Sequence, residues 1–146
     1  MSSTSLVKSI LFFSLLGLVI ALYSLLHNSG FVSGSFCTLS ETVNCDVVNK
    51  GAYSSIWGIP VALVGVLGYF FLAAGALLKL RQPTDRSLSL FLLIASVGGL
   101  AFSFYLTFLE AFVLHAWCAL CVTSQLLILI IFIFSIALNQ KKPTVL

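Results

Sequence analysis

The sequence predicts an all-α integral membrane protein, a four-helix transmembrane bundle with an outer loop and a short interfacial helix between the first two spans. Hydrophobic residues make up 60% of the 146 residues and charged residues only 8%, whereas a soluble domain carries about 25% charged residues. The mean hydropathy is +1.17. Four apolar runs reach the roughly 20 residues that a helix needs to cross a bilayer. The length predicts a single domain over residues 1–146.

The four predicted spans are helices, because backbone groups in lipid must satisfy one another and strands would be shorter and alternating. A cleaved signal peptide is the alternative for the first run, since Lys8 precedes an apolar core. That run is long for a signal core, and no clear A-x-A site follows it. The predicted spans cover approximately residues 6–26, 57–80, 88–109 and 117–138.

Between the first two spans, residues 28–56 form the predicted outer loop. The stretch "HNSGFVSGSFCTLSETVNC" is rich in Ser, Gly, Asn and Thr, which is typical of a loop. The second half of this segment predicts a short helix on the membrane. Pro60 then opens the second span, because proline is favoured in the first turn of a helix. Four glycines in the middle spans predict close helix packing, namely Gly65, Gly68, Gly98 and Gly99.

The basic residues predict the orientation. Six of the seven fall on one side of a four-span bundle, and only Lys50 falls on the other. Because lysine and arginine mark cytoplasmic segments, both termini are expected in the cytoplasm. The outer loop and a short turn at residues 110–116 should face outward, as expected for a multi-pass protein of the inner (plasma) membrane. The basic residues form no stripe, so no nucleic-acid partner is expected.

All four cysteines fall on the predicted outer side, where disulfides persist. Cys118 and Cys121, in "HAWCALC", sit at the mouth of the fourth span, and residues three apart share one helix face. The helix N-terminus stabilises a thiolate, and a thiolate is the nucleophile in disulfide exchange. The alternative is an inert disulfide, but closing so short a loop stabilises little.

Cys37 and Cys45 enclose seven residues. Taken alone, this pair is better interpreted as a structural staple of the loop. Beside a C-x-x-C on the same membrane face, however, it forms a second dithiol that a mobile loop can bring to the first. A zinc site of four cysteines fits poorly, because such sites use two closely spaced pairs, so no metal is expected. We therefore predict that all four cysteines are catalytic.

A dithiol at the lipid boundary needs an electron acceptor that dissolves there, and quinones do. The sequence leaves the roles of His115 and Glu110 open: each is either a group of the site or an ordinary interfacial residue. Nearby aromatic residues are candidates to line a pocket for a flat ring, although interfacial packing is their commoner role; they are Trp57, Phe102, Tyr105, Phe108 and Trp117.

The motifs together resemble the vitamin K epoxide reductase family in its bacterial form. They are the C-x7-C loop pair, "YSSIWGIPVALVG", and "FYLTFLEAFVLHAWCALCVTSQ". The resemblance runs from the first span to the end of the fourth. The bacterial disulfide oxidase DsbB is a rival with two cysteine pairs, but it carries its C-x-x-C between the first two spans.

The resemblance implies a bundle around a quinone of the ubiquinone or menaquinone type. In the family, the residue matching Cys121 faces the quinone, and the residue matching Cys118 exchanges with the one matching Cys45. Cys37 would then meet an extracytoplasmic thioredoxin-like (DsbA-type) protein, which is reoxidised to support disulfide bond formation. We predict Ser54, Trp57 and Gln125 as quinone-binding residues.

The chain departs from the family pattern at several positions. Gly51 stands where a Ser or Thr is usual, although Ser54 or Ser55 can supply a hydroxyl. Gln125 stands where vertebrate members with epoxide activity carry Tyr. No fused thioredoxin-like domain follows the fourth span, so the partner is expected to be a separate protein. Two alternatives stay open: a quinone or vitamin K epoxide reductase, and a non-enzymatic membrane scaffold with structural disulfides.

Overall fold

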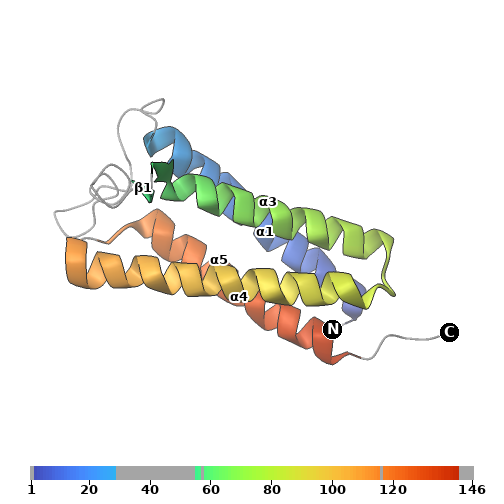
Figure 1. Cartoon of the computed structure of the whole chain (residues 1–146). Helices are drawn as coiled ribbons and strands as arrows, with labels where there is room; N and C mark the ends of the chain where they lie inside the picture. The colour runs from blue at the N-terminus through green and yellow to red at the C-terminus, as the bar shows by residue number, and fades with distance from the viewer. Residues whose placement is uncertain (1, 29–54, 57, 116, 142–146) are drawn as a thin grey trace.

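Four long helices lie along one another in the computed structural model (Figure 1). The structure describes residues 2–28, 55–56, 58–115 and 117–141. The helices are α1 (Ser3–Asn28), α3 (Val61–Arg81), α4 (Arg86–Phe108) and α5 (Ala119–Gln140). Each is long and apolar enough to cross a membrane, α4 being prolonged to Val113. The prediction of an all-α bundle of four spans is confirmed. Most of the segment expected to form a short helix before the second span lies outside the described residues, and its described end, Ser55–Ile56 and Ile59–Pro60, is strand instead.

The helices pack in a fixed order. α1 contacts α3 and α5, and α4 contacts α5 more extensively than it contacts α3. The core draws on all four helices, with Ile10, Leu72, Leu92 and Ile131 among its buried members. Large apolar side chains also point outward, such as Phe12 and Ile94 at 61% and 62% exposure. Extensive apolar surface of this kind suits lipid rather than water.

The second span begins later than predicted. Ser55–Ile56 (β1) and Ile59–Pro60 (β2) pair as a two-stranded antiparallel hairpin. Gly58 occupies the left-handed region with φ +82°, which its missing Cβ permits. The helix therefore starts at Val61, with Pro60 as its N-cap rather than in its first turn. The predicted start at residue 57 was wrong because the hairpin residues are apolar, and hydropathy alone does not separate them from the span that follows.

The turn between α3 and α4 is closed by a buried lysine. Lys79 is only 6% exposed, and its Nζ donates to the carbonyl oxygens of Pro83 (2.9 Å) and Asp85 (2.6 Å). The Asp85 carboxylate accepts the N–H of Ser87 at 2.8 Å and so caps α4. Carbonyls and amides that a helix end leaves unpaired are thus satisfied locally.

At the opposite end, α4 does not stop in a turn at residues 110–116 as predicted. The chain continues as a π-helix, η1 (Leu109–Leu114), until His115 ends it with φ 51°. The apolar residues after Glu110 sustain the helix, and the wider π turn changes where its side chains point. Such π turns are rare and are often found at functional sites. α5 then begins at Ala119, with Cys118 as its N-cap.

Only some of the glycines mediate close helix packing. A Cβ at Gly99 would lie 3.1 Å from Ile128, and one at Gly65 would lie 3.6 Å from Ala21. Gly68 and Gly98 have no atom within 4 Å of such a Cβ. The close-packing prediction was wrong for these two, which line a cavity instead.

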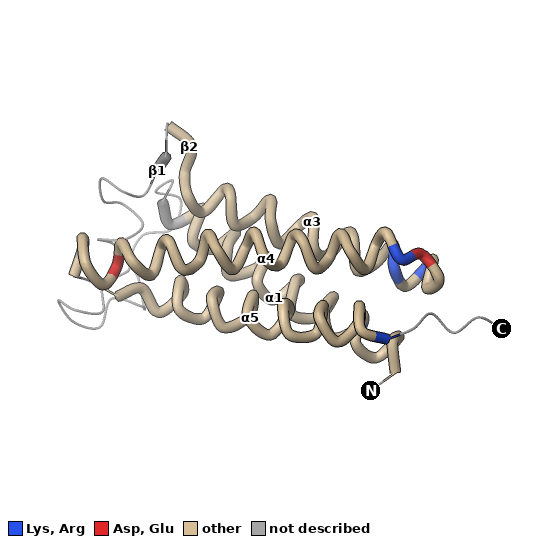
Figure 2. The backbone as a smooth tube through the Cα atoms, turned by 60° about the horizontal axis from the view of Figure 1, so that its bottom comes forward, with Lys and Arg blue, Asp and Glu red and all other residues tan. Residues whose placement is uncertain are grey.

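The two ends of the bundle differ in charge. Lys and Arg of the described residues gather where α1 starts, α5 ends and α3 turns into α4 (Figure 2). We call this the basic end. The opposite end holds η1 and the segment Cys118–Cys121, and we call it the cysteine end. The predicted grouping of basic residues is therefore present for the residues that the structure describes.

Candidate functional site

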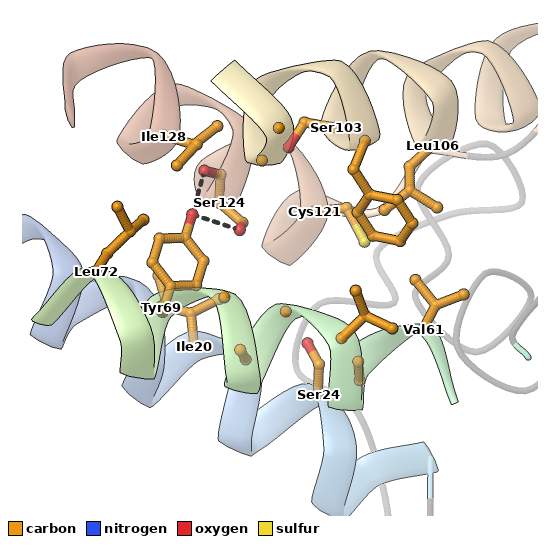
Figure 3. Close-up of a pocket in the computed structure, with 18 of the residues that line it drawn as sticks. Ile20, Ser24, Val61, Tyr69, Leu72, Ser103, Leu106, Cys121, Ser124 and Ile128 are labelled. Atoms are coloured by element: carbon orange, nitrogen blue, oxygen red, sulfur yellow. Dashed lines mark hydrogen bonds between the residues drawn. The ribbon is translucent and has the colours of Figure 1, made fainter. Parts of the chain in front are cut away.

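A cavity of about 570 Å³ lies inside the bundle and reaches the cysteine end. All four helices contribute to its wall, which is mostly apolar and carries a few polar groups. Figure 3 shows representative side chains, and Cys121 projects from the start of α5 on the same side as Val61 and Leu106. Pockets for small molecules typically measure roughly 300–1,000 Å³ and combine apolar walls with a few polar groups.

Tyr69 and Ser124 form a polar contact in the cavity wall, away from Cys121 (Figure 3). The Tyr69 hydroxyl lies 2.7 Å from the Ser124 carbonyl oxygen, to which it donates, and 2.8 Å from Ser124 Oγ. Its ring covers Gly17 of α1, where an added Cβ would overlap the ring. Sequence analysis missed this pair, although a tyrosine within an apolar span was a usable signal.

Cys118 and Cys121 meet at the first turn of α5. Cys118 is buried, and its Sγ accepts the backbone N–H of Cys121 at 3.4 Å. Cys121 is half-buried and lines the cavity. The hydrogen bond with the Cys121 side chain lowers the pKa of Cys118, while burial and the charge of Glu110 oppose that shift. The arrangement sets a thiol of lowered pKa beside one that lines the cavity.

Glu110 is a pocket residue rather than a surface carboxylate, which the sequence left open. Its side chain is 2% exposed and lines the cavity. Its Oε2 accepts the backbone N–H of Cys118 at 3.3 Å, and the carboxylate also hydrogen-bonds the Cys121 side chain. The η1 helix thus connects the end of α4 to both cysteines.

The predicted quinone-binding residues are only partly covered by the structure. Ser54 and Trp57 lie outside the described residues. Gln125 hydrogen-bonds the Thr107 hydroxyl, and it is Thr107, not Gln125, that lines the cavity. Gln125 therefore supports the wall from behind, and the sequence analysis missed Thr107.

Among the aromatic candidates, Phe102 lines the cavity. Tyr105, Phe108 and Trp117 are exposed on the outside of the bundle, as the interfacial interpretation expected. His115 is likewise exposed, at the left-handed junction after η1.

The loop cysteines Cys37 and Cys45, together with Gly51, lie outside the described residues. Their exchange with the C-x-x-C pair stays a prediction. Within the described part of the chain, no cluster of three or more His, Cys, Asp or Glu side chains has the arrangement of a metal site.

The chemistry of the cavity wall suits a lipid-soluble ring. Its walls are apolar, its polar groups are few, and a thiol lies at its edge. A model of the vitamin K epoxide reductase family matches residues 8–136. The match covers all four described helices for most of their length.

Proposed function

The chain belongs to the vitamin K epoxide reductase family, and on that premise we propose that it is a quinone-dependent disulfide oxidoreductase. Family members are oxidoreductases that act with quinones and thiols, and this chain is a multi-pass membrane protein. The specific proposal is that it reoxidises a separate thioredoxin-like protein outside the cytoplasm. The protein would lie in the inner membrane, with its cysteines outward and both termini in the cytoplasm.

One observation carries the proposal: Cys121 lines an apolar cavity within the bundle, and the buried Cys118 lies beside it. A thiol pair in this position can receive electrons from the loop side and release them to a ligand in the cavity. A quinone, when bound, supplies the two-electron acceptor. Tyr69, Ser124 and Thr107 offer the polar groups in the wall that can orient its ring.

The proposed path has two disulfide exchanges and one oxidation. The partner dithiol reduces the Cys37–Cys45 disulfide, and the partner leaves as a disulfide. The Cys37–Cys45 dithiol then reduces the Cys118–Cys121 disulfide: Cys45 attacks Cys118 and displaces Cys121, and Cys37 attacks Cys45 and releases Cys118, so that the loop disulfide re-forms. Finally the Cys118–Cys121 dithiol loses two electrons and two protons to the quinone, and its disulfide re-forms. Each exchange is an attack by a thiolate on a disulfide, and the lowered pKa of Cys118 makes it a good leaving group when the loop disulfide re-forms.

The test is partner oxidation by purified protein with added quinone. Replacing Cys118 or Cys121 by Ala should abolish turnover, and so should Cys37→Ala or Cys45→Ala. Thr123→Ala is a matched control, because Thr123 is exposed on the same first turns of α5 and, among the described residues, its hydroxyl bonds only the Ala119 carbonyl. It should leave turnover unchanged.

The same assay separates the alternatives. A scaffold with structural disulfides predicts that quinone changes neither the thiol count nor the rate. A quinone or epoxide reductase predicts that Cys118 and Cys121 stay essential, while a small dithiol replaces the protein partner without loss of rate. Full activity of the Cys121→Ala variant would refute the proposed function.

A further inference from the structure

Glu110 is the only acidic side chain that the structure describes at the cysteine end. The other described acid, Asp85, lies at the basic end. Glu110 falls within a candidate membrane span and is 2% exposed. Burying a carboxylate is costly unless it is paired and hydrogen-bonded. Ionisable residues inside membrane spans usually mark functional sites.

The partners of Glu110 are both cysteines of the C-x-x-C. Its Oε2 accepts the Cys118 N–H at 3.3 Å, and its carboxylate hydrogen-bonds the Cys121 side chain. Among the side chains that the structure describes, Lys and Arg lie at the basic end and His115 is exposed, so no ion pair with Glu110 is found among them. Accepting one backbone amide does not by itself require a carboxylate, because a neutral amide oxygen is also an acceptor.

We propose that Glu110 is the general base that takes the proton from the Cys121 thiol when the dithiol is oxidised. This inference rests on the proposed function, because it concerns the step in which electrons leave the C-x-x-C. The carboxylate lies next to the Cys121 side chain, and both residues line the same cavity, so the carboxylate is placed to take the proton that must leave. Glu110 also lines the cavity, so the proton can continue to the acceptor without crossing the apolar wall.

The step balances as follows. The Cys121 S–H bond breaks, and its proton moves to the Glu110 carboxylate. The Cys118 thiol loses the second proton, and the Cys118–Cys121 S–S bond forms. Two electrons and two protons leave in total, and the quinone named in the proposed function takes them up and becomes a quinol. Glu110 gives up its proton to the acceptor oxygen and is again a carboxylate.

Other described groups are poorly placed for this role. His115 is exposed at the junction after η1. The Tyr69 hydroxyl is engaged by Ser124 at a different part of the cavity wall (Figure 3). Cys118 itself loses a proton in the same step. Glu110 alone among them combines contact with Cys121, burial and a place in the cavity wall.

The decisive variant is Glu110→Gln, which keeps an acceptor oxygen for the Cys118 N–H but cannot take a proton. Single-turnover oxidation of the reduced C-x-x-C by a soluble quinone should slow about 100-fold near neutral pH, the lower range for losing a general base. The deficit should shrink as pH rises, because hydroxide then removes the thiol proton. Asp85→Asn is the matched carboxylate-to-amide control at the basic end and should behave as wild type.

A second readout does not depend on turnover. Infrared difference spectra of wild-type protein, recorded between the dithiol and disulfide states, should contain a carboxyl band that reports a change at Glu110. The band should be absent from Glu110→Gln and displaced in Glu110→Asp. If the wild-type spectrum contains no carboxyl change, the proposal is overturned, whether or not the variants fold.

Glu110→Gln protein that matches wild type in rate at every pH also overturns the proposal, and leaves Glu110 as an anchor for the Cys118 amide. This result is distinguishable from failure of the proposed function. In that case Cys121→Ala protein would retain quinone-dependent activity, whereas here it would be inactive.

Discussion

Cys118 occupies a helix position that usually belongs to Ser, Thr, Asp or Asn. As the N-cap of α5, it accepts the Cys121 amide N–H on its sulfur. A thiolate serves this position better than a thiol, because the amides at a helix N-terminus favour negative charge. The cap therefore stabilises the helix and the reactive form of the side chain together.

The pH dependence of Cys118 alkylation follows from its lowered pKa. The principal cause is the hydrogen bond with the Cys121 side chain. Because a lower pKa yields thiolate at lower pH, alkylation of Cys118 should begin at a lower pH than that of an ordinary cysteine. Without Cys121 the pKa should rise, so the midpoint should move to higher pH in Cys121→Ala.

The measurement is the rate of iodoacetamide alkylation against pH, followed by mass spectrometry on protein that carries Cys37→Ala and Cys45→Ala. Protein with Cys121 intact is the reference. An unchanged midpoint after Cys121→Ala would show that burial and the Glu110 charge, rather than the neighbouring thiol, control Cys118.

Residue-level prediction succeeded where the spacing of residues determines geometry. Two cysteines three positions apart at the start of a span correctly predicted the neighbouring thiols at the first turn of α5. Prediction failed where a contact between distant residues determines the position of a side chain. The direction of Glu110 depends on the π turn of η1, and Tyr69 gains its role only by crossing to Ser124. Gln125, predicted to bind the quinone, supports Thr107 from behind the wall.

At the scale of elements, α1 and α3 pack closely where Gly17 lies under the Tyr69 ring. Gly17→Ala should force the ring away and weaken its hydrogen bonds to Ser124. Overpacking of this kind costs roughly 1–3 kcal/mol. We therefore expect a lower midpoint of thermal unfolding in detergent, measured by circular dichroism.

Gly68→Ala is the control for this substitution, because no atom lies within 4 Å of its added Cβ. Alanine at an unstrained helical glycine typically stabilises a protein by about 0.4–1 kcal/mol. Equal stability losses in the two variants would mean that the contact with Tyr69 does not limit helix packing.

The four spans were predictable because each apolar run is long enough to cross a bilayer. The first and last residues of the spans were harder to predict, because hydropathy does not distinguish a helix from other apolar structure. Ile59 and Pro60 belong to a hairpin that Gly58 closes. At the other end, the residues after Glu110 continue α4 as η1. Both errors fall where the chain enters or leaves the cysteine end.

At the scale of the whole molecule, charge divides the bundle along its length. The described Lys and Arg residues lie at the basic end, and the C-x-x-C lies at the other (Figure 2). From this polarity and the positive-inside rule, we predict that the basic end lies in the cytoplasm. The thiol pair would then face the compartment in which disulfides persist.

Topology is testable with a membrane-impermeant maleimide on reduced, oriented vesicles. Cys37 and Cys45 should be labelled only from the outer face. A single cysteine introduced as Gln140→Cys, in protein without the native cysteines, should be labelled only from the inner face, because Gln140 ends α5 at the basic end and is exposed. Labelling of the loop cysteines from the inner face would invert the proposed orientation.

The cavity has one more consequence, for folding thermodynamics. Glycines such as Gly65, Gly68 and Gly98 line the cavity of about 570 Å³, so no large side chain fills it from these positions. The contacts that a filled core would supply must come from a guest, and a guest held only by the folded state adds RT ln(1 + [L]/Kd) to stability. At a guest concentration about 100 times Kd, the gain is about 2.7 kcal/mol. The heat resistance of this bundle should therefore track the abundance of its lipid-soluble guest in the surrounding membrane, and the protein should be least durable in membranes depleted of it.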